Sequence, residues 1–499
     1  MENQTGAENG CPTVQRGGER TEFVRGLSLL DGTMLVAGNM IGSGIFIVSA
    51  DIARQVGSPG WLLAVWLMTG VLTLIAAMSY GELAAMFPHA GGQYIYLREA
   101  FGPMWAFLYG WALFLVIQTG TIAAVSIAFA RFLGVLWPAV SPANLVLDFG
   151  LLPLRGIGNL SMSLSTQQLV GILATAVLTW INLRGLHAGR LIQDVFTVTK
   201  IGALLGLIAL GAFIGSRPDA AIHTADFWTP KANGEVISAL MLLPVLGTAM
   251  VGSLFASDAW NNVGFTGSEM KNPTRNLPLS MALGVALVTV LYLLANLTYL
   301  GALPMSAIQH AEQDRVGVAV AKVIFGGYAE ILMAVAIMIS TFGCMNGMIL
   351  AGARVYYSMA HDGLFFSKVG TLNRNRVPAA ALILQGIWII VLTLPRSFDP
   401  VSHTYSNLYS NLLDYIVFGV LLFYILTMAS LFVLRRKRPD LERPVRAKGH
   451  PWLTALYIVC AGGICLTLLL AEKTRLNAGL GLLVILTGLP VYALWRRRA

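Results

Sequence analysis

The amino-acid sequence predicts an all-α polytopic membrane protein with twelve transmembrane helices. Hydrophobic residues make up 56% of its 499 residues and charged residues only 11%, whereas about a quarter of the residues in a soluble domain are charged. The apolar runs are about twenty residues long, which is the length of helix that crosses a bilayer core. Alternating segments of about ten residues, which are typical of outer-membrane barrels, are absent.

Twelve apolar segments can be marked, and several are long enough to tilt or to contain a break. They are residues 29–56, 61–87, 102–136, 166–183, 190–215, 239–268, 279–303, 318–358, 378–395, 408–434, 452–471 and 477–495. The chain then divides into a cytoplasmic N-terminal tail (1–26), a ten-helix core (27–434), a basic cytoplasmic loop (435–451), helices eleven and twelve (452–495) and a cytoplasmic C-terminus (496–499). The tail lacks the apolar region of a cleavable signal, so we expect the first helix to direct insertion.

The lysines and arginines predict that both termini are cytoplasmic. In that orientation 21 of them lie on the cytoplasmic side and about ten on the other, as the positive-inside rule requires. The run RRKRPDLERPVRAK, residues 435–448, acts as a topology signal or binds anionic lipid headgroups. We expect a multi-pass protein of the plasma or inner membrane, with the bilayer as a partner. Nucleic acid is excluded as a partner, because no basic soluble domain remains outside the spans.

No reaction chemistry is expected from the side chains. The four cysteines, Cys11, Cys344, Cys460 and Cys465, have neither the spacing of a disulfide framework nor that of a metal site. There is also no nucleophile–base pair. We therefore expect no metal, no cofactor and no enzyme.

Two apolar segments are interrupted by small and polar residues. GNMIGSGIFI, residues 38–47, contains Gly42-Ser43-Gly44, and GSLFASDAWNN, residues 252–262, interrupts segment six. Close helix packing also uses small residues, but usually spaced by four. Discontinuous helices at matching positions of two five-helix halves indicate a secondary transporter with an inverted repeat. Segments 1–5 and 6–10 are the expected halves.

A broken helix offers both signs of charge at one place. The second half-helix begins with free N–H groups at its positive end, and the first half ends with free carbonyls at its negative end. This pattern matches the carboxylate and ammonium of an amino acid. The Ser43 hydroxyl would donate to the carboxylate, and carbonyls near Phe255 and Ser257 would accept from the ammonium. The candidate substrate-binding residues are Met40, Ile41, Gly42, Ser43, Gly44, Phe255, Ser257, Asp258 and Asn261.

Asp258 is a carboxylate within the membrane, where charges are costly and usually face a cavity. It either binds the substrate ammonium, takes part in proton movement, or caps the second half of helix six.

Lys200 stands about ten residues into segment five, too deep for its side chain to reach the interface. We expect it to donate to the freed Gly42 carbonyl and to a hydroxyl of segment eight, Ser340 or Thr341. An ammonium there would occupy the position of a sodium ion, which favours sodium-independent transport. A purely structural tether has the same geometry.

Other polar and aromatic residues have gating or structural roles. Phe255 and Trp260 flank the second break, where an aromatic ring can close a cavity against water. Asn261, Asn346 and Asn411 lie in apolar runs and need partners. Glu269 forms either an inner gate with Arg354 or Lys271, or a solvated interfacial pair, and Glu82 lies near the inner end of segment two.

Several motifs resemble the amino acid–polyamine–organocation superfamily, and especially its L-type amino acid transporter branch. They are GNMIGSGIF, the stretch GSPGWLLAVWLMTGVLTLIAAMSYGELAAMFPHAGGQYIYLREAFG, LFASDAWNNVGFTGSEMKNPTRNLP, STFGCMNGMILAGARVYYSMAHDG and LERPVR, within residues 25–450. The resemblance implies the five-plus-five inverted repeat of LeuT-like transporters and alternating access, often with obligatory exchange.

The resemblance also implies residue roles. Residues 41–44 would hold the substrate backbone, Phe255 would gate the site, and Lys200 with Ser340 would take part in coupling. The loop 137–165 has no cysteine, whereas the animal light chains of this branch use one there, so no disulfide-linked ancillary subunit is expected.

The expected function is sodium-independent transport of neutral amino acids, by exchange or facilitated uptake. One alternative is a cationic amino acid or polyamine antiporter, in which Asp258 pairs with the second ammonium. Another is a proton-coupled amino acid symporter. A channel would need a filter or a charged ring, and a sensor would need a signalling tail; the sequence has neither.

Overall fold

The computed structural model describes residues 23–154, 158–214, 216–232, 235–399, 404–405, 408–471 and 474–496. Most of the predicted N-terminal tail, the C-terminal residues 497–499 and the Asn411 side chain lie outside the described part. The helices are α1 (Leu29–Met40), α2 (Gly44–Val56), α3 (Pro59–Met86), α4 (Gln93–Phe101), α5 (Pro103–Ala112), the π-helical η1 (Leu113–Ile117), α6 (Gln118–Leu136), α7 (Thr166–Leu183), α8 (Leu186–Ile214), α9 (Ala239–Ala256), α10 (Asn262–Phe265), α11 (Pro273–Ala302), α12 (Met305–Gln309), α13 (Val316–Phe325), α14 (Ala329–His361), α15 (Ala379–Thr393), α16 (Leu408–Lys437), α17 (Trp452–Leu470) and α18 (Arg475–Arg496). Short 3₁₀ turns join some of them: η2 (Ala221–His223), η3 (Gly267–Glu269), η4 (Glu312–Asp314), η5 (Gly326–Tyr328) and η6 (Ser367–Gly370).

The chain is mostly helical and crosses a membrane many times. Within the described residues, nine helical segments are long and apolar enough to span a bilayer, or ten when α1 and α2 count as one bent span. The helices α9 and α15, in predicted segments six and nine, are apolar but too short to be counted with them. Predicted segment eight is divided between α13 and α14.

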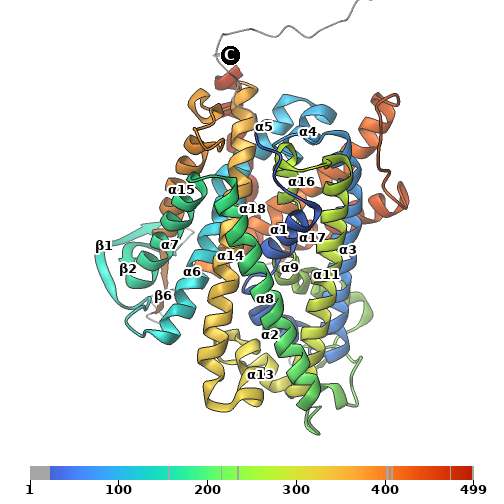
Figure 1. The fold of residues 1–499 in the computed structure, drawn as a ribbon. Helices are drawn as coiled ribbons and strands as arrows, with labels where there is room; N and C mark the ends of the chain where they lie inside the picture. Colours follow the sequence, from blue (N-terminus) through green and yellow to red (C-terminus); the bar gives the residue numbers. More distant parts are fainter. Residues whose placement is uncertain are drawn as a thin grey trace, which may run out of the picture.

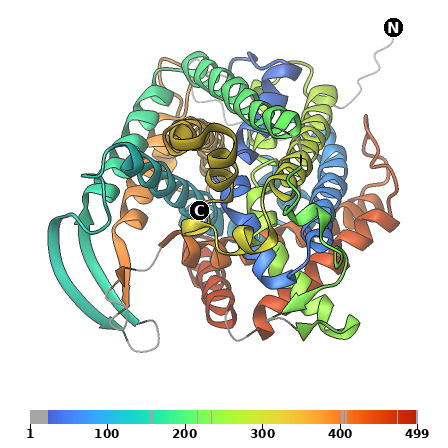
Figure 2. The ribbon, with the colours of Figure 1, turned by 90° about the horizontal axis from the view of Figure 1, so that it is seen from below.

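The expectation of an all-α fold is wrong in one respect, because the structure contains two small antiparallel sheets. The larger one has the strand order β1-β2-β5-β6, and the smaller pairs β3 (Lys231–Ala232) with β4 (Glu235–Val236). The long loop 137–165 forms β1 (Leu145–Leu154) and β2 (Gly158–Ser165). β2 also pairs with β5 (Pro395–Asp399), which is followed by β6 (Thr404–Tyr405). The hairpin lies to one side of the helices, on the left in Figures 1 and 2.

The first helix lies at the centre of the helical body. α1 packs against α8, α11 and α14, while α3 lies along α11 and α6 lies along α14 (Figure 1). α1 begins with a capping box: the Ser28 hydroxyl accepts from the Asp31 N–H, and the Asp31 carboxylate accepts from the Ser28 N–H. This arrangement satisfies two otherwise unpaired donors and fixes where the central helix starts.

The start of α1, the segment that follows α10 and the loop after α16 lie at one end of the molecule, here named the basic end. Leu27 forms a bridge with Met270, and Glu82 on α3 contacts Arg435 at the end of α16. This end is the cytoplasmic side of the predicted topology.

Candidate functional site: two helix breaks at the centre of the bundle

The first break lies where the sequence predicts it. α1 ends at Met40 and α2 begins at Gly44, with a bend of 45° between them. The prediction that the helix is discontinuous here is confirmed. Gly44 contacts the end of α9: a Cβ atom at this position would lie only 2.6 Å from the Cβ of Ala256. The two breaks are therefore in direct contact.

The carbonyls at the end of α1 are not free, in contrast to the sequence-based expectation. Each carbonyl from residue 38 to residue 42 accepts a hydrogen bond from a side chain of α8, α11 or α14. The contacts are Lys200 Nζ to Gly38 (2.5 Å) and Ile41 (2.9 Å), Cys344 Sγ to Asn39 (3.0 Å), Tyr292 Oη to Met40 (2.9 Å), and Ser340 Oγ to Ile41 (2.9 Å) and Gly42 (3.3 Å). The protein itself occupies the side of the break that could otherwise bind a cation.

Lys200 reaches the break as predicted, but with different partners. Lys200 is 2% exposed, and its ammonium donates to the carbonyls of Gly38, Ile41 and Ser340. The Gly42 carbonyl instead accepts from the Ser340 hydroxyl. The Thr341 hydroxyl bonds within its own helix, to the Ile337 carbonyl. Three acceptors match the three N–H donors of an ammonium, so the buried charge is fully satisfied.

The opposite side of the first break keeps unpaired donors. In the described chain, the N–H groups of Gly44 and Ile45 have no hydrogen-bond acceptor, while the Phe46 N–H bonds to the Ser43 carbonyl. These groups begin α2, where the helix dipole is positive. Unpaired N–H groups at a positive helix end favour an anion, such as a carboxylate.

The second break separates α9 from a single helical turn, α10. Residues 257–261 are not helical, and Ala259 has a positive φ of 65°. The Tyr292 hydroxyl lies 3.0 Å from the Ala256 carbonyl oxygen as well as 2.9 Å from that of Met40. Its single proton is shared between the two acceptors, so one side chain of α11 joins both breaks.

Two small adjoining cavities, each of about 20 Å³, lie beside the second break. Asp258, Val420 and Tyr424 line both. The Asp258 carboxylate accepts a hydrogen bond from the Tyr424 hydroxyl at 2.6 Å, and the Asn261 amide donates to Gln93 at 2.9 Å. The cavities therefore combine one carboxylate with neutral polar groups, inside walls that are mainly apolar and aromatic.

The predicted site residues fall into two groups. Phe255, Ser257, Asp258, Trp260 and Asn261 each line a cavity, whereas Met40, Ile41, Gly42, Ser43 and Gly44 lie at the first break and line neither cavity.

The two candidate gating aromatics differ in their surroundings. Phe255 is half-buried against Ala124 and Ala128 of α6. Trp260 is fully buried, with its ring 4.8 Å from Tyr80 and 5.4 Å from Tyr424. Both remain predictions as gating residues.

Comparison with known proteins agrees with this arrangement. Residues 27–489 match the family described as amino acid permeases. The chain belongs to this family. This membership confirms the resemblance seen in the sequence and agrees with the expectation of a transporter rather than an enzyme.

The permease is similar to curated transporters over nearly its whole length. It is 28% identical over 491 residues to the "Large neutral amino acids transporter small subunit 2" of Homo sapiens, and the alignment covers 98% of this chain and 84% of the relative. It is 28% identical over 475 residues to the "Serine/threonine exchanger SteT" of Bacillus subtilis (strain 168), with coverages of 95% and 97%. It is 29% identical over 499 residues to the "Asc-type amino acid transporter 1" of Homo sapiens, with coverages of 97% and 86%.

Three residues of the permease that organise the breaks were not identified from the sequence. Tyr292 joins the breaks, Tyr424 holds Asp258, and Gln93 links Asn261 to α16 through the Phe423 carbonyl. Gln93 lies in the quoted motif HAGGQYIYL, where an amide in an apolar context was the available signal. The two tyrosines offer no such signal, because tyrosine is common in apolar cores.

A buried ion pair lies at the basic end of the permease. Arg354 and Glu269 form two hydrogen bonds of 2.9 Å, and each side chain is 1% exposed. The expectation of a solvated pair is therefore wrong, because Glu269 on η3 and Arg354 on α14 are both buried. Lys271 is exposed and is not the partner of Glu269.

A second cluster at the same end joins α4 to the segment after α14. The Tyr94 hydroxyl donates to Asp362 at 2.7 Å, and Arg98 bonds the same carboxylate at 2.6 Å. Burial, together with the Asp362 charge, raises the pKa of Tyr94 well above its usual range, so this hydroxyl is a donor at every physiological pH.

Proposed function

We propose that this permease exchanges neutral amino acids across the membrane without sodium, by alternating access between its two faces. The observation that carries the proposal is the Lys200 ammonium, bonded to the Gly38 and Ile41 carbonyls at the first break. An ammonium in this position supplies the positive charge that a bound sodium ion would supply. The names of the relatives, which refer to large neutral amino acids and to serine/threonine exchange, support the substrate class.

Helix packing supports the inverted repeat and the twelve spans as part of the same proposal. The half-helix α1 packs against α10, and α2 packs against α9. α3 lies against α11, α6 against α14, and α7 against α15. These are the pairs that an axis relating segments 1–5 to segments 6–10 would place together. α9 and α15 then count as spans six and nine, and α17 and α18 lie outside the repeat.

The substrate is proposed to bind beside the two breaks, next to the cavities that Asp258 lines. Its carboxylate accepts from the unpaired N–H groups of Gly44 and Ile45, at the start of α2. Its ammonium faces the second break, where Asp258 and Asn261 line the cavity. The Tyr424 hydroxyl already donates to Asp258, which favours a neutral substrate over one that brings a second ammonium.

A cationic amino acid or polyamine antiporter is the second candidate, because Asp258 is a carboxylate beside the cavity. The two candidates differ in their response to Asp258→Asn. A diamine substrate would lose its charge partner and its transport, whereas transport of a neutral amino acid would only weaken.

Counterflow in proteoliposomes tests the proposal. Vesicles preloaded with single amino acids are assayed for uptake of labelled serine, leucine, arginine and putrescine, in sodium and in choline buffers. We expect counterflow with neutral amino acids at equal rates in both buffers. Sodium-dependent uptake would refute the role given to Lys200, and counterflow only with arginine or putrescine would favour the second candidate.

An imposed pH gradient distinguishes proton symport from exchange. If the pH gradient drives accumulation of a labelled amino acid in empty vesicles, and Lys200→Ala abolishes this accumulation, the permease is a proton-coupled symporter.

The permease is proposed to act in the plasma or inner membrane with both termini cytoplasmic, and without a disulfide-linked subunit. The segment 137–165 contains no cysteine that could form such a bond. Cross-linking and non-reducing electrophoresis of the purified chain check this point.

A further inference from the structure

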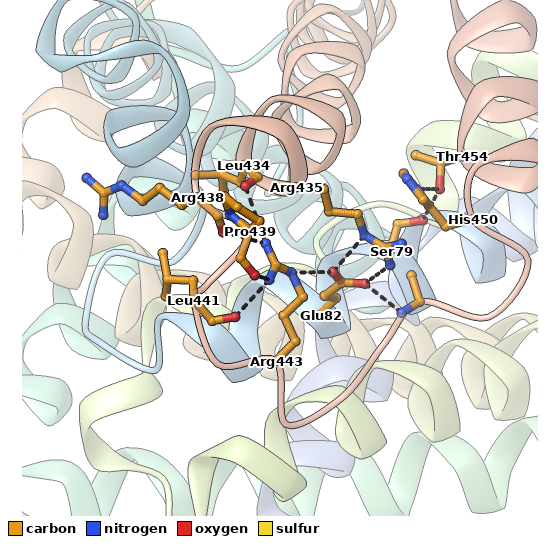
Figure 3. Close-up of polar contacts among 11 residues, drawn as sticks. Ser79, Glu82, Leu434, Arg435, Arg438, Pro439, Leu441, Arg443, His450 and Thr454 are labelled. Atoms are coloured by element: carbon orange, nitrogen blue, oxygen red, sulfur yellow. Dashed lines mark hydrogen bonds and ion pairs between the residues drawn. The ribbon is translucent and has the colours of Figure 1, made fainter.

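A buried carboxylate fixes the basic loop against the end of α3. The Glu82 side chain is 1% exposed and accepts hydrogen bonds from the Arg435 guanidinium at 3.1 and 2.6 Å and from the Ala447 N–H at 2.7 Å. Arg443 pairs with the same carboxylate at 3.5 Å. Figure 3 shows Glu82 between the two arginines. One anion therefore neutralises two of the loop's cations and sets the path of its backbone.

The same loop is also folded by Arg443. Its guanidinium donates to the carbonyls of Leu434, Arg438, Pro439 and Leu441 (Figure 3). These bonds hold the segment between α16 and α17 in one conformation. The positions of the remaining loop cations are therefore set by the fold.

An apolar groove runs along the outer side of this loop. It has a volume of about 500 Å³ and lies between α3, the first turns of α11 and the loop. Its apolar wall is formed by Met78, Pro278, Leu279, Ala282, Pro444 and Val445. α3 and α11 lie side by side at the edge of the helical body, on the right in Figure 1. The groove is thus placed where a lipid chain can enter from the bilayer.

Three cations line the same groove: Arg275, Arg446 and Lys448. All three are exposed. Among the described residues, none of them has an ion pair or a side-chain hydrogen bond. The acidic residues of the loop, Asp440 and Glu442, do not line the groove. An apolar groove with an uncompensated positive rim is complementary to an amphiphile with an anionic head.

We propose that this groove binds an anionic phospholipid, with an acyl chain along α3 and α11 and the phosphate among Arg275, Arg446 and Lys448. The bilayer is the source, because the predicted orientation places the groove in the cytoplasmic leaflet, which carries anionic lipids. The loop then has a role beyond topology: its Glu82-bound arginines are structural, and its unpaired cations hold a lipid.

Native mass spectrometry of the purified full-length chain tests the proposal. The probes are phosphatidylglycerol, phosphatidylcholine with the same acyl chains, and glycerol 3-phosphate as the headgroup alone. We expect phosphatidylglycerol to bind at least tenfold more tightly than either of the others. Equal binding of phosphatidylcholine, or equally tight binding of glycerol 3-phosphate, would overturn the proposal.

Matched variants locate the binding. R446Q/K448Q is expected to weaken phosphatidylglycerol binding about 30-fold, since each basic residue near an anionic surface contributes about a factor of five. The control K368Q/R374Q removes two exposed cations of the loop before α15, outside the groove, and is expected to change binding less than twofold. An equal loss in both variants would mean that only general surface charge is sensed.

Ala282→Trp tests the acyl-chain part, because it fills the groove without changing a charge. We expect it to weaken phosphatidylglycerol binding about as strongly as R446Q/K448Q. If the tryptophan variant does not elute as a folded species, Ala282→Leu replaces it. Unchanged lipid affinity in a folded groove-filling variant would contradict the proposed position of the chain.

Discussion

Replacing Glu269 with Gln is expected to open the permease at its basic end. In the structure Glu269 joins two elements: its carboxylate holds Arg354 of α14, and its backbone carbonyl accepts from the N–H groups of Gly26 and Leu27 at 2.9 Å each. Arg354 also donates to the Leu350 carbonyl. The pair therefore ties the segment before α1 to α14 across the cytoplasmic side of the proposed pathway.

The size of the effect follows from the burial of both partners. Removing one partner of a buried ion pair costs about 3–5 kcal/mol, because the remaining charge stays unpaired in a site of low dielectric. In a state open at this end, water would hydrate the Arg354 guanidinium and remove most of that cost. The ratio of open to closed states should therefore rise at least about 100-fold in Glu269→Gln, at 1.4 kcal/mol for each factor of ten.

The native Cys344 reports this opening. It is 4% exposed and its thiol donates to the Asn39 carbonyl beside the first break, so a maleimide can reach it only when a pathway opens. The parent for this assay carries Cys11→Ser, Cys460→Ala and Cys465→Ala, so that Cys344 is its remaining cysteine. The rate of maleimide labelling of Cys344 is measured in inside-out vesicles. We expect a large increase in Glu269→Gln.

Two controls separate the pair's role from general damage. Glu330→Gln removes the same charge from an exposed pair, Lys322–Glu330, whose partners are 47% and 46% exposed, and is expected to change the rate less than fivefold. The double variant Glu269→Gln/Arg354→Met leaves no unpaired charge, so the labelling rate of Cys344 should fall back most of the way to that of the parent. A Cys344 labelling rate in Glu269→Gln within twofold of the parent would refute this reasoning.

Four further predictions concern the breaks themselves. Lys200→Met leaves the Gly38 carbonyl without its side-chain donor, at about 1–3 kcal/mol, while the Ile41 carbonyl keeps the bond from the Ser340 hydroxyl. Exchange in proteoliposomes and thermal stability should both fall. An exchange rate equal to that of the wild type would contradict the role of Lys200 as a tether. Tyr292→Phe removes the hydroxyl shared by both breaks, and the maximal exchange rate should drop while the protein remains folded by thermal denaturation. Asp258→Asn should reduce neutral amino acid exchange without abolishing it, measured by counterflow, and complete loss would point to a direct ionic role. Gly44→Ala should eliminate exchange, because the added Cβ would lie 2.6 Å from Ala256. The control Gly42→Ala should retain exchange, because the nearest atom to its Cβ would be 3.7 Å away. Equal losses of exchange in the two variants would show that the contact of Gly44 with Ala256 is not the cause.

The positions of the breaks were predictable, because they depend on local composition. Successive small residues weaken a helix and leave its backbone groups to be satisfied by something else. Lys200 was predictable for a similar reason, since a buried ammonium must find acceptors. The identity of those acceptors was not. Which of the Gly38, Ile41 and Gly42 carbonyls faces α8 depends on the rotation of two helices, and that is set by packing along their whole length.

The burial of the ion pair at the basic end could also not be predicted from the sequence. Glu269 and Arg354 both lie near predicted segment ends, where charged residues are usually hydrated. Only the tertiary packing around η3 and α14 removes water from them. Tyr292 and Tyr424 were missed for a related reason: each contributes one hydroxyl to the site from a side chain that is otherwise part of the core.

The sheet was missed although a local signal existed. In residues 159–165, NLSMSLS, apolar and polar residues alternate, which is typical of a strand. The preceding run LVLDFGLLPL is apolar but too short to span a bilayer. The high apolar content of the whole chain made helix the default expectation, and pairing of β2 with β5 depends on a segment more than 200 residues away.

The contacts at the first break constrain how the permease can alternate. Lys200 holds the end of α1 through two carbonyls and α14 through a third. Hydrogen bonds to a charged group contribute about 1.5–3 kcal/mol each, so separating α1 from Lys200 would cost several kcal/mol with no replacement donor in the described surroundings. By contrast, the Glu269–Arg354 pair lies at the end of the molecule, where water can replace each partner when they part. We therefore expect the end of α1 to move together with α8 and α14 as one unit, and the cytoplasmic side to open by separation at Glu269 rather than at Lys200.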